Sequence, residues 1–158
     1  HHVAQEYFSK AALRSPPHIT LHMPFKMSLK KKSRLINELT NFFIQQPTFS
    51  LSLAGFGSFP PKVIFVKVEG NQQISNLQQG LGQLMARKLS IYNANYRSKP
   101  FNPHITIACR DLKKDMFLKA WDFYRTQTYQ TEFEVNHITL LMHDGKRWHH
   151  HHSFKLSS

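Results

Sequence analysis

The string Pro-His-Ile-Thr occurs twice in this chain, at residues 17–20 and again at residues 103–106. An aliphatic residue follows each copy, Leu21 after the first and Ile107 after the second. A single His-x-Thr triplet carries little information in a chain with eleven histidines, but a repeated five-residue pattern carries much more. The repeat predicts two equivalent strands, each presenting one imidazole and one hydroxyl, and therefore a site built from two halves.

The spacing within each copy matters because side chains two residues apart in a strand point to the same face. His18 and Thr20 should therefore share one face, as should His104 and Thr106, while the isoleucine between each pair faces the core. Two such strands related by a pseudo-twofold axis would bring the imidazoles together, with the hydroxyls between them.

Facing histidines of this kind suit in-line displacement at phosphorus. A neutral imidazole can take a proton from the attacking group and a protonated one can give a proton to the leaving oxygen, because histidine titrates near neutral pH, with an ordinary pKa of ~6.5. Hydroxyl groups can donate hydrogen bonds to the non-bridging phosphate oxygens. We therefore predict His18, Thr20, His104 and Thr106 as the catalytic residues, with no metal and no cofactor. The sequence leaves open which histidine is the acid and which is the base.

A metal site is the main alternative for the first copy, because His18 and His22 lie four residues apart. That spacing brings two imidazoles onto one ion only in a helix; in a strand the rings lie ~13 Å apart. Pro17 and Pro24 argue against a helix here. We do not expect a zinc site.

The composition indicates a packed globular protein with a strong basic charge. There are 21 Lys and Arg residues against 9 Asp and Glu, a formal net charge of +12, which favours phosphorylated or polyanionic partners. We expect a monomer in the cytoplasm, because no apolar run is long enough to cross a bilayer and Cys109 is the only cysteine. Basic residues cluster after the first copy and before the second: Lys26, Lys30, Lys31, Lys32, Arg34, Arg87, Lys88, Arg97 and Lys99.

Hydrophobic periodicity predicts alternating helices and strands without a linker. Helices are expected over residues 2–13, 28–46 and 72–90, with a short one around Phe117–Tyr124. Strands are expected over 17–23, 48–56, 62–69, 103–109, 130–142 and 146–156, the last two joined by a tight turn at Asp144-Gly145. The second half repeats the motif strand, helix and hairpin of the first half. We therefore predict an α+β fold with two pseudo-symmetric lobes.

The paired strings resemble the two-histidine phosphoesterase superfamily, which includes the 2′-5′ RNA ligase (LigT-like) proteins and the cyclic phosphodiesterases. The likeness extends to Ser15–Leu21 with Pro24-Phe25, to Phe101–Ala108, to Gly55-Phe56-Gly57, and to Gly145 and Trp148. It implies a bilobal fold in which two antiparallel-rich sheets flank a central cleft, with helices outside. The same four His and Thr residues take the catalytic positions. Because the family usually begins with a strand, we expect residues 1–158 to be one two-lobed phosphoesterase domain that lacks this strand.

The resemblance also implies the reaction, which is metal-independent opening of 2′,3′-cyclic or related cyclic phosphates of nucleotides or RNA ends. Two alternatives stay open: 2′-5′ RNA ligation at the same site, and a non-catalytic RNA-binding domain. Arg110, His22 and Phe25 are candidate substrate-binding residues, the first two because strand alternation would place them on the motif face. A third triplet, His137-Ile138-Thr139, lacks the preceding proline, and we expect it to lie away from substrate.

Overall fold

The computed structural model describes residues 1–92 and 100–158, so Arg97 and Lys99 lie outside the described part of the chain. Its helices are α1 (His2–Glu6), α2 (Lys32–Phe43), α3 (Gln72–Leu89) and α4 (Lys114–Tyr124), with 3-10 segments η1 (Ala11–Arg14) and η2 (Leu29–Lys31). Its strands are β1 (Phe49–Phe59), β2 (Val63–Val68), β3 (His104–Ala108), β4 (Gln130–Val135), β5 (His137–His143) and β6 (Trp148–Lys155).

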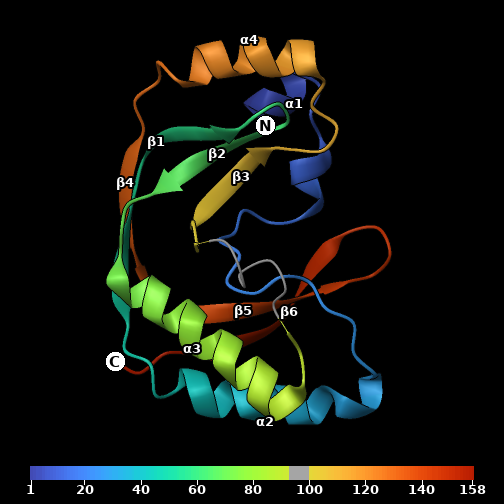
Figure 1. The fold of residues 1–158 in the computed structure, drawn as a ribbon, viewed down its shortest axis with the longest axis vertical. Coiled ribbons are helices and arrows are strands. Elements are labelled where there is room, and N and C mark those ends of the chain that lie inside the picture. Colours follow the sequence, from blue (N-terminus) through green and yellow to red (C-terminus); the bar gives the residue numbers. More distant parts are fainter. Residues whose placement is uncertain (93–99) are drawn as a thin grey trace.

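The strands form two antiparallel sheets. Four of them pair in the order β3-β2-β1-β4, and β5 pairs with β6 in a separate two-stranded sheet. Figure 1 shows the larger sheet beneath α4 and the smaller sheet above α2, with α3 running obliquely across the same end of the molecule. The predicted hairpin over residues 48–69 is confirmed as β1 and β2, and the tight turn at Asp144-Gly145 is confirmed between β5 and β6.

The single strand predicted over residues 130–142 is wrong, because the chain changes sheets at Asn136. β4 ends at Val135 on the edge of the larger sheet, and β5 begins at His137 in the smaller one. The Asn136 carbonyl accepts a hydrogen bond from the backbone N–H of Leu156, at 2.9 Å. Residue alternation cannot show this break, since both strands are extended and only their partners differ.

Two further boundaries differ from the periodicity. The first predicted helix stops at Glu6, and Phe8 has a positive φ of 57° before the chain resumes as η1. The second begins with the 3-10 turn η2 and becomes α-helical only at Lys32.

The third predicted helix agrees closely with α3. Asn71 caps this helix by accepting from the N–H groups of Gln73 and Ile74, at 2.8 and 3.1 Å.

Most of the buried apolar side chains form two separate cores, one for each lobe. The first lies between α2, α3 and β6 and contains Leu35, Leu39, Phe43, Phe49, Leu51, Ile74, Leu77, Leu81, Met85, Phe154 and Leu156. The second lies between α1, β2, β3 and α4 and contains Val3, Ile64, Ala108, Leu112, Phe117, Ala120 and Tyr124. This division confirms the predicted bilobal α+β fold.

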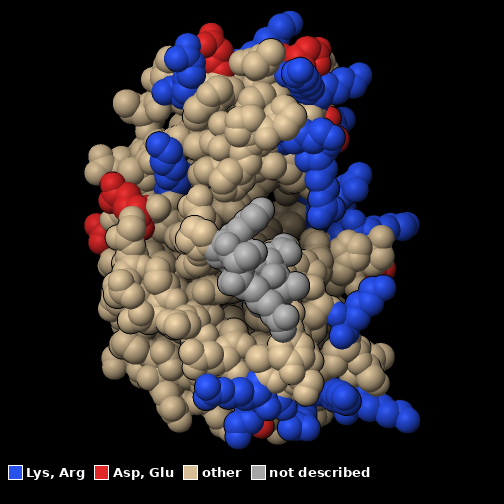
Figure 2. All heavy atoms as spheres, in the orientation of Figure 1, with Lys and Arg blue, Asp and Glu red and all other residues tan. Residues whose placement is uncertain are grey.

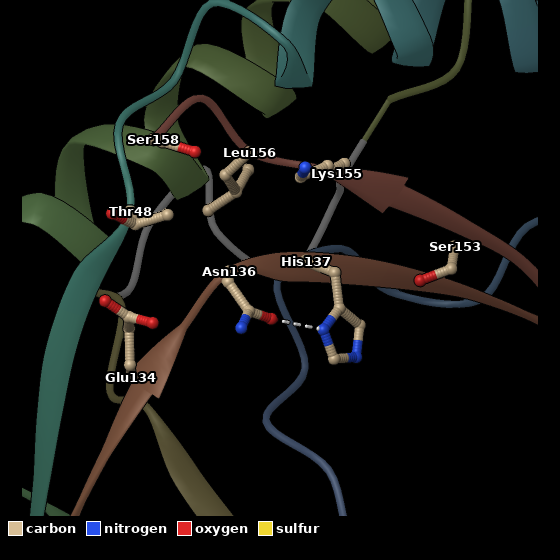
Figure 3. A pocket seen from close by; sticks show the side chains of 8 residues that line it. All are labelled: Thr48, Glu134, Asn136, His137, Ser153, Lys155, Leu156 and Ser158. Atoms are coloured by element: carbon tan, nitrogen blue, oxygen red, sulfur yellow. Dashed lines mark hydrogen bonds between the residues drawn. The ribbon is translucent and has the colours of Figure 1, made fainter.

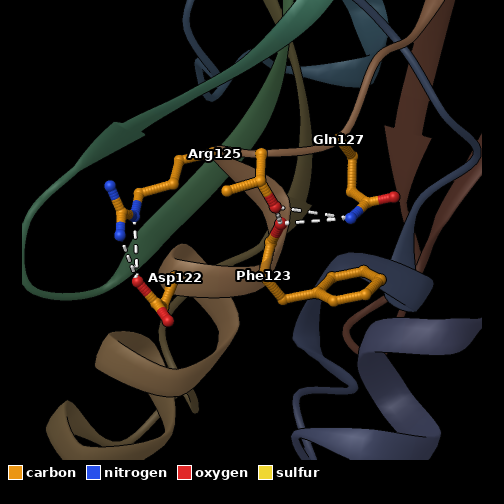
Figure 4. A network of polar contacts seen from close by, with 5 residues as sticks. Asp122, Phe123, Arg125 and Gln127 are labelled. Atoms are coloured by element: carbon orange, nitrogen blue, oxygen red, sulfur yellow. Dashed lines mark hydrogen bonds and ion pairs between the residues drawn. The ribbon is translucent and has the colours of Figure 1, made fainter.

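Polar contacts surround the C-terminal end of α4, just before the chain continues to β4 (Figure 4). The Arg125 guanidinium pairs with the Asp122 carboxylate, with Nε 2.9 Å from Oδ1. The Phe123 carbonyl accepts from the Thr126 hydroxyl at 2.8 Å. Across residues 1–92 and 100–158, no helix combines the length and the apolar character needed to cross a membrane.

Candidate functional site: the paired His-x-Thr segments

The first motif does not form the strand predicted over residues 17–23. Only Ile19 makes a β-bridge, and the backbone bends at Leu21 and His22. Pro16, Pro17 and Pro24 have no N–H to donate to a ladder, which explains why pairing does not spread along this segment. The second motif is a strand as predicted, since β3 begins at His104.

The two motifs nevertheless meet, because Ile19 forms an isolated antiparallel bridge with Ile105 on β3. In this register His18 lies across from Thr106, and Thr20 lies across from His104. Residues directly opposite each other in such a pair have Cβ atoms about 4.5–5.5 Å apart. Alternation along β3 places His104 and Thr106 on the face opposite Ile105.

Each motif is packed on a different core. Ile19 and Leu21 contact the first core, whereas Ala108 belongs to the second and Ile107 packs against it. The bridge therefore joins the two lobes, and the four polar side chains stand where the lobes meet. Of the two imidazoles, His18 is exposed and His104 is partly exposed.

Both imidazoles are held in the same way. His18 Nδ1 lies 2.7 Å from the carbonyl oxygen of Pro16, and His104 Nδ1 lies 2.7 Å from the carbonyl oxygen of Asn102. A carbonyl can only accept, so Nδ1 carries the hydrogen in each ring. The neutral form of either histidine therefore has its lone pair on Nε2. The Ser15 hydroxyl also lies 3.1 Å from His18 Nδ1 and stabilises the same orientation.

Two aromatic rings support His104, and the sequence did not single them out. The Phe65 and Phe59 ring centroids lie 4.9 and 5.3 Å from the imidazole centroid. Phe65 stands over Gly57, where an added Cβ would come within 2.5 Å of the Phe65 ring. The hairpin register pairs Gly57 with Phe65. A role for Phe65 beside His104 could be predicted from it only by knowing which strand lies beside β3.

His22 lies next to the motif but not in extended register with it. Its Nδ1 donates to the Met23 carbonyl at 2.8 Å, and its ring meets Phe25 edge-on at 5.7 Å. Its buried Nε2 has no hydrogen-bond partner among the described residues. Burial lowers the pKa of His22, and the bond to Met23 offsets this only in part. Phe25 packs against the first core, and a substrate-binding role for either residue stays a prediction.

Arg110 is not placed by strand alternation, contrary to the sequence argument. β3 ends at Ala108, and Arg110 has a positive φ of 54° in a bend beyond it. Its side chain is exposed, and a role in holding substrate stays a prediction.

The third triplet lies at a different place. His137 lines a hollow of about 730 Å³ at the junction of β4, β5 and β6, which none of the four motif residues lines (Figure 3). Its Nδ1 contacts Oδ1 of Asn136 at 2.7 Å. The hollow is lined by Thr48, Glu134, Asn136, His137, Ser153, Lys155, Leu156 and Ser158. Within the described residues, no three His, Cys, Asp or Glu side chains gather in a metal-binding arrangement.

Comparison with known proteins gives the family. A family model described as the 2′-5′ RNA ligase superfamily matches residues 1–147. The chain belongs to the 2′-5′ RNA ligase superfamily. A Geobacillus sp. (strain WCH70) protein named "Putative phosphoesterase" is 31% identical over 128 residues, covering 80% of this chain and 69% of the relative. A Bacillus cytotoxicus protein of the same name is 29% identical over 147 residues, covering 83% and 80%.

Solved structures of this superfamily share the fold. The crystal structure of E. coli LigT complexed with 3′-AMP superposes with a TM-score of 0.65 at 21% identity, over 99% of this chain and 88% of LigT. The chain is thus a LigT-like, two-histidine phosphoesterase.

Proposed function

We propose that this phosphoesterase opens 2′,3′-cyclic phosphates of nucleotides or RNA ends, with His18 and His104 as the proton-transfer pair. The observation that carries the proposal is the Ile19–Ile105 bridge, which sets one His-x-Thr triplet against the other. The matching Nδ1 contacts support it, because they leave an Nε2 on each ring for proton transfer.

The reaction is an in-line displacement. The neutral histidine takes a proton through Nε2 from a water molecule, whose oxygen forms a bond to phosphorus. The bond from phosphorus to one ribose oxygen breaks, and the second histidine, protonated beforehand, gives its Nε2 proton to that oxygen. The product is a phosphate monoester, and the two histidines have exchanged protonation states. A proton returned through solvent resets the site.

Thr20 and Thr106 hold the non-bridging oxygens. Each threonine lies across from the histidine of the other motif, so each hydroxyl stands beside a proton-transfer group from the opposite lobe. Hydroxyl donors at this position stabilise the negative charge on the phosphate oxygens during displacement. The mechanism needs these four side chains to act from both lobes at once.

Nucleotide chemistry at this site is supported by the relatives. The LigT structure contains 3′-AMP, which is the kind of monoester that opening a cyclic phosphate would leave. The superfamily description also favours a second reaction at the same site, 2′-5′ RNA ligation. In that reaction a 5′-hydroxyl of RNA replaces water, and the proton transfers are unchanged. A cytoplasmic location fits the lone Cys109, whose thiol pKa is raised by burial.

The test is product analysis after incubating the protein with 2′,3′-cyclic AMP in EDTA, beside a His104→Ala variant. The proposal expects 2′- or 3′-AMP from the wild type and a loss of about 10²- to 10⁴-fold in the variant. Equal turnover in the two proteins would contradict it. If only an RNA with a 5′-hydroxyl and a cyclic-phosphate end reacts, and gives a joined product, ligation is the function.

A further inference from the structure

A second hollow carries four basic side chains and neither of the paired motifs. It lies between η1 and the β5–β6 turn and has a volume of about 540 Å³. Its lining comes from two chain segments more than a hundred residues apart: Lys10, Leu13, Arg14, Gly145, Lys146 and Arg147. Figure 2 shows Lys and Arg side chains along the edge where Figure 1 places the N-terminal segment and this turn.

Among the described residues, none of these four cations has an acidic partner. Within the described part of the chain, the ion pairs are Arg125 with Asp122 and His149 with Asp144, and neither involves a basic residue of the hollow. Four like charges brought together in this way repel one another. An anionic ligand would relieve that repulsion.

The two acidic residues beside the hollow are occupied in holding its walls. Asp111 accepts from the Ser9 hydroxyl at 2.7 Å and from the backbone N–H of Lys10 and of Ala11, at 2.8 and 2.9 Å. These bonds fix the start of η1 at the end of β3.

The other wall is fixed by Asp144. Its Oδ1 accepts from the backbone N–H of Lys146 and of Arg147, at 2.7 and 2.8 Å, and its Oδ2 contacts His149 Nε2 at 2.7 Å. Both carboxylates therefore bond to backbone N–H groups, to the Ser9 hydroxyl and to the His149 imidazole, while the ammonium and guanidinium groups of the hollow stay available. The walls are ordered, and the charges they carry face solvent.

One wall of the hollow lies close in sequence to His18, the first of the paired histidines. Arg14 is followed by Ser15, whose hydroxyl contacts His18 Nδ1. Arg14 also lies near the end of β3: burial raises the pKa of Cys109, and the charges of Arg110 and Arg14 act in the opposite direction. Arg14 thus stands close to both motif segments.

We propose that Lys10, Arg14, Lys146 and Arg147 bind backbone phosphates of a single-stranded RNA whose terminal cyclic phosphate lies at the paired histidines. The inference rests on the proposed function and specifies its substrate class. A cyclic mononucleotide has one phosphate, which the histidines must hold. Cations in a separate hollow suit a ligand with further phosphates, and an oligonucleotide supplies these at regular intervals from its reacting end. The lining has no aromatic ring to stack on a base and no Asn or Gln to read one, so we assign its four cations to phosphates, which carry no sequence information.

The test compares a Lys146→Ala, Arg147→Ala double variant with a control of equal charge and composition, Arg87→Ala, Lys88→Ala, on the exposed last turn of α3. Both variants spare the backbone bonds of the residues they replace. Binding of a fluorescein-labelled 12-nucleotide RNA ending in a 3′-phosphate is measured by anisotropy at several salt concentrations. This RNA does not react, so binding is read independently of catalysis.

The proposal expects roughly tenfold weaker binding by the Lys146, Arg147 variant. The slope of log K against log salt should fall by about 1.4, which is ~0.7 for each lost phosphate contact to a single strand. The control should match the wild type. Equal binding by all three proteins, or an equal loss in both variants, would overturn the proposal.

Turnover separates this inference from the proposed function. With 2′,3′-cyclic AMP, the Lys146, Arg147 variant should keep the wild-type kcat/KM, whereas with a 12-nucleotide RNA ending in a cyclic phosphate its KM should rise. If the wild type turns over neither substrate but the variant still loses RNA affinity, the hollow stands and the proposed reaction fails.

Discussion

Ile19 and Ile105 pair across the boundary between the two lobes, and this one bridge sets the register of all four proposed catalytic side chains. Ile19 packs on the core formed by α2, α3 and β6. Ile105 sits on β3, whose far end is buried in the other core. The contact that aligns the histidines is therefore also a contact between the two lobes.

The Gly57→Ala variant tests the aromatic support of His104. The added methyl would meet the Phe65 ring at 2.5 Å, and Phe65 in turn contacts the imidazole of His104. We expect a loss of about 1–3 kcal/mol in the free energy of unfolding, since overpacking forces a buried ring to move. We also expect kcat on a cyclic phosphate to fall more than KM changes, because the displaced ring no longer positions His104.

Gly82→Ala is the matched control. Gly82 lies inside α3 with nothing within 4 Å of an added Cβ, so the change should be neutral or stabilise the helix by up to ~1 kcal/mol. Similar effects of the two substitutions on melting temperature and kcat would show that the Gly57–Phe65 contact does not position the histidine.

Stability should depend on the protonation of His22. Burial lowers the pKa of this histidine below its ordinary 6.5, so between the two values the unfolded chain binds a proton that the folded chain does not. Its contribution to stability is therefore complete above pH 6.5 and declines as pH falls toward the folded value. In His22→Asn, an amide can still donate to the Met23 carbonyl but cannot titrate.

Urea unfolding at pH 5.5 and pH 7.5 measures this. The wild type should lose more stability than His22→Asn on acidification, and the difference between the two proteins isolates His22 from the other histidines. An identical loss in both would mean that His22 does not titrate differently in the folded and unfolded chains.

Asp111 should contribute to stability by holding η1 against the end of β3. Burial tends to raise its pKa, but the bonds from Ser9, Lys10 and Ala11 outweigh this and lower it. The contribution is present above pH ~4 and is lost as pH falls through the lower folded value. Asp111→Asn should cost about 1 kcal/mol at pH 7, an exposed site being worth less than a buried one.

Unfolding at pH 7 and pH 3 gives the check for Asp111. The gap between wild type and Asp111→Asn should be wide at pH 7 and narrow at pH 3. Asp122→Asn, which removes an exposed carboxylate that pairs with Arg125, serves as the control and should show little effect at either pH. A gap of constant size at the two pH values would contradict the role given to the Asp111 carboxylate.

The sequence predicted the fold best where local and tertiary preferences agree. Apolar residues at helical spacing predicted α3 almost to the residue, and in the structure Asn71 caps it. The first motif shows the opposite case. Its β-branched residues favour a strand, but three prolines remove the donors that a strand needs, and only Ile19 finds a partner.

Repetition in the sequence made part of the candidate site predictable, and the parts without a repeated string could not be predicted. Repetition in the chain reveals His18 and His104, because two equivalent segments leave two equivalent strings. No repeated string in the sequence marks Phe65 or the residues of the basic hollow. They depend on which strand neighbours β3 and on η1 lying beside the β5–β6 turn, and both are consequences of topology that periodicity does not encode.

The most direct test of the central claim is the dependence of rate on pH for opening 2′,3′-cyclic AMP by the wild type, His18→Ala and His104→Ala. If one neutral and one protonated histidine share the proton transfers, the wild-type profile is bell-shaped. Each variant then loses one limb along with about 10²- to 10⁴-fold of the rate. A wild-type rate that rises steadily from pH 5 to pH 9, or one variant with wild-type activity, would contradict the paired-histidine account.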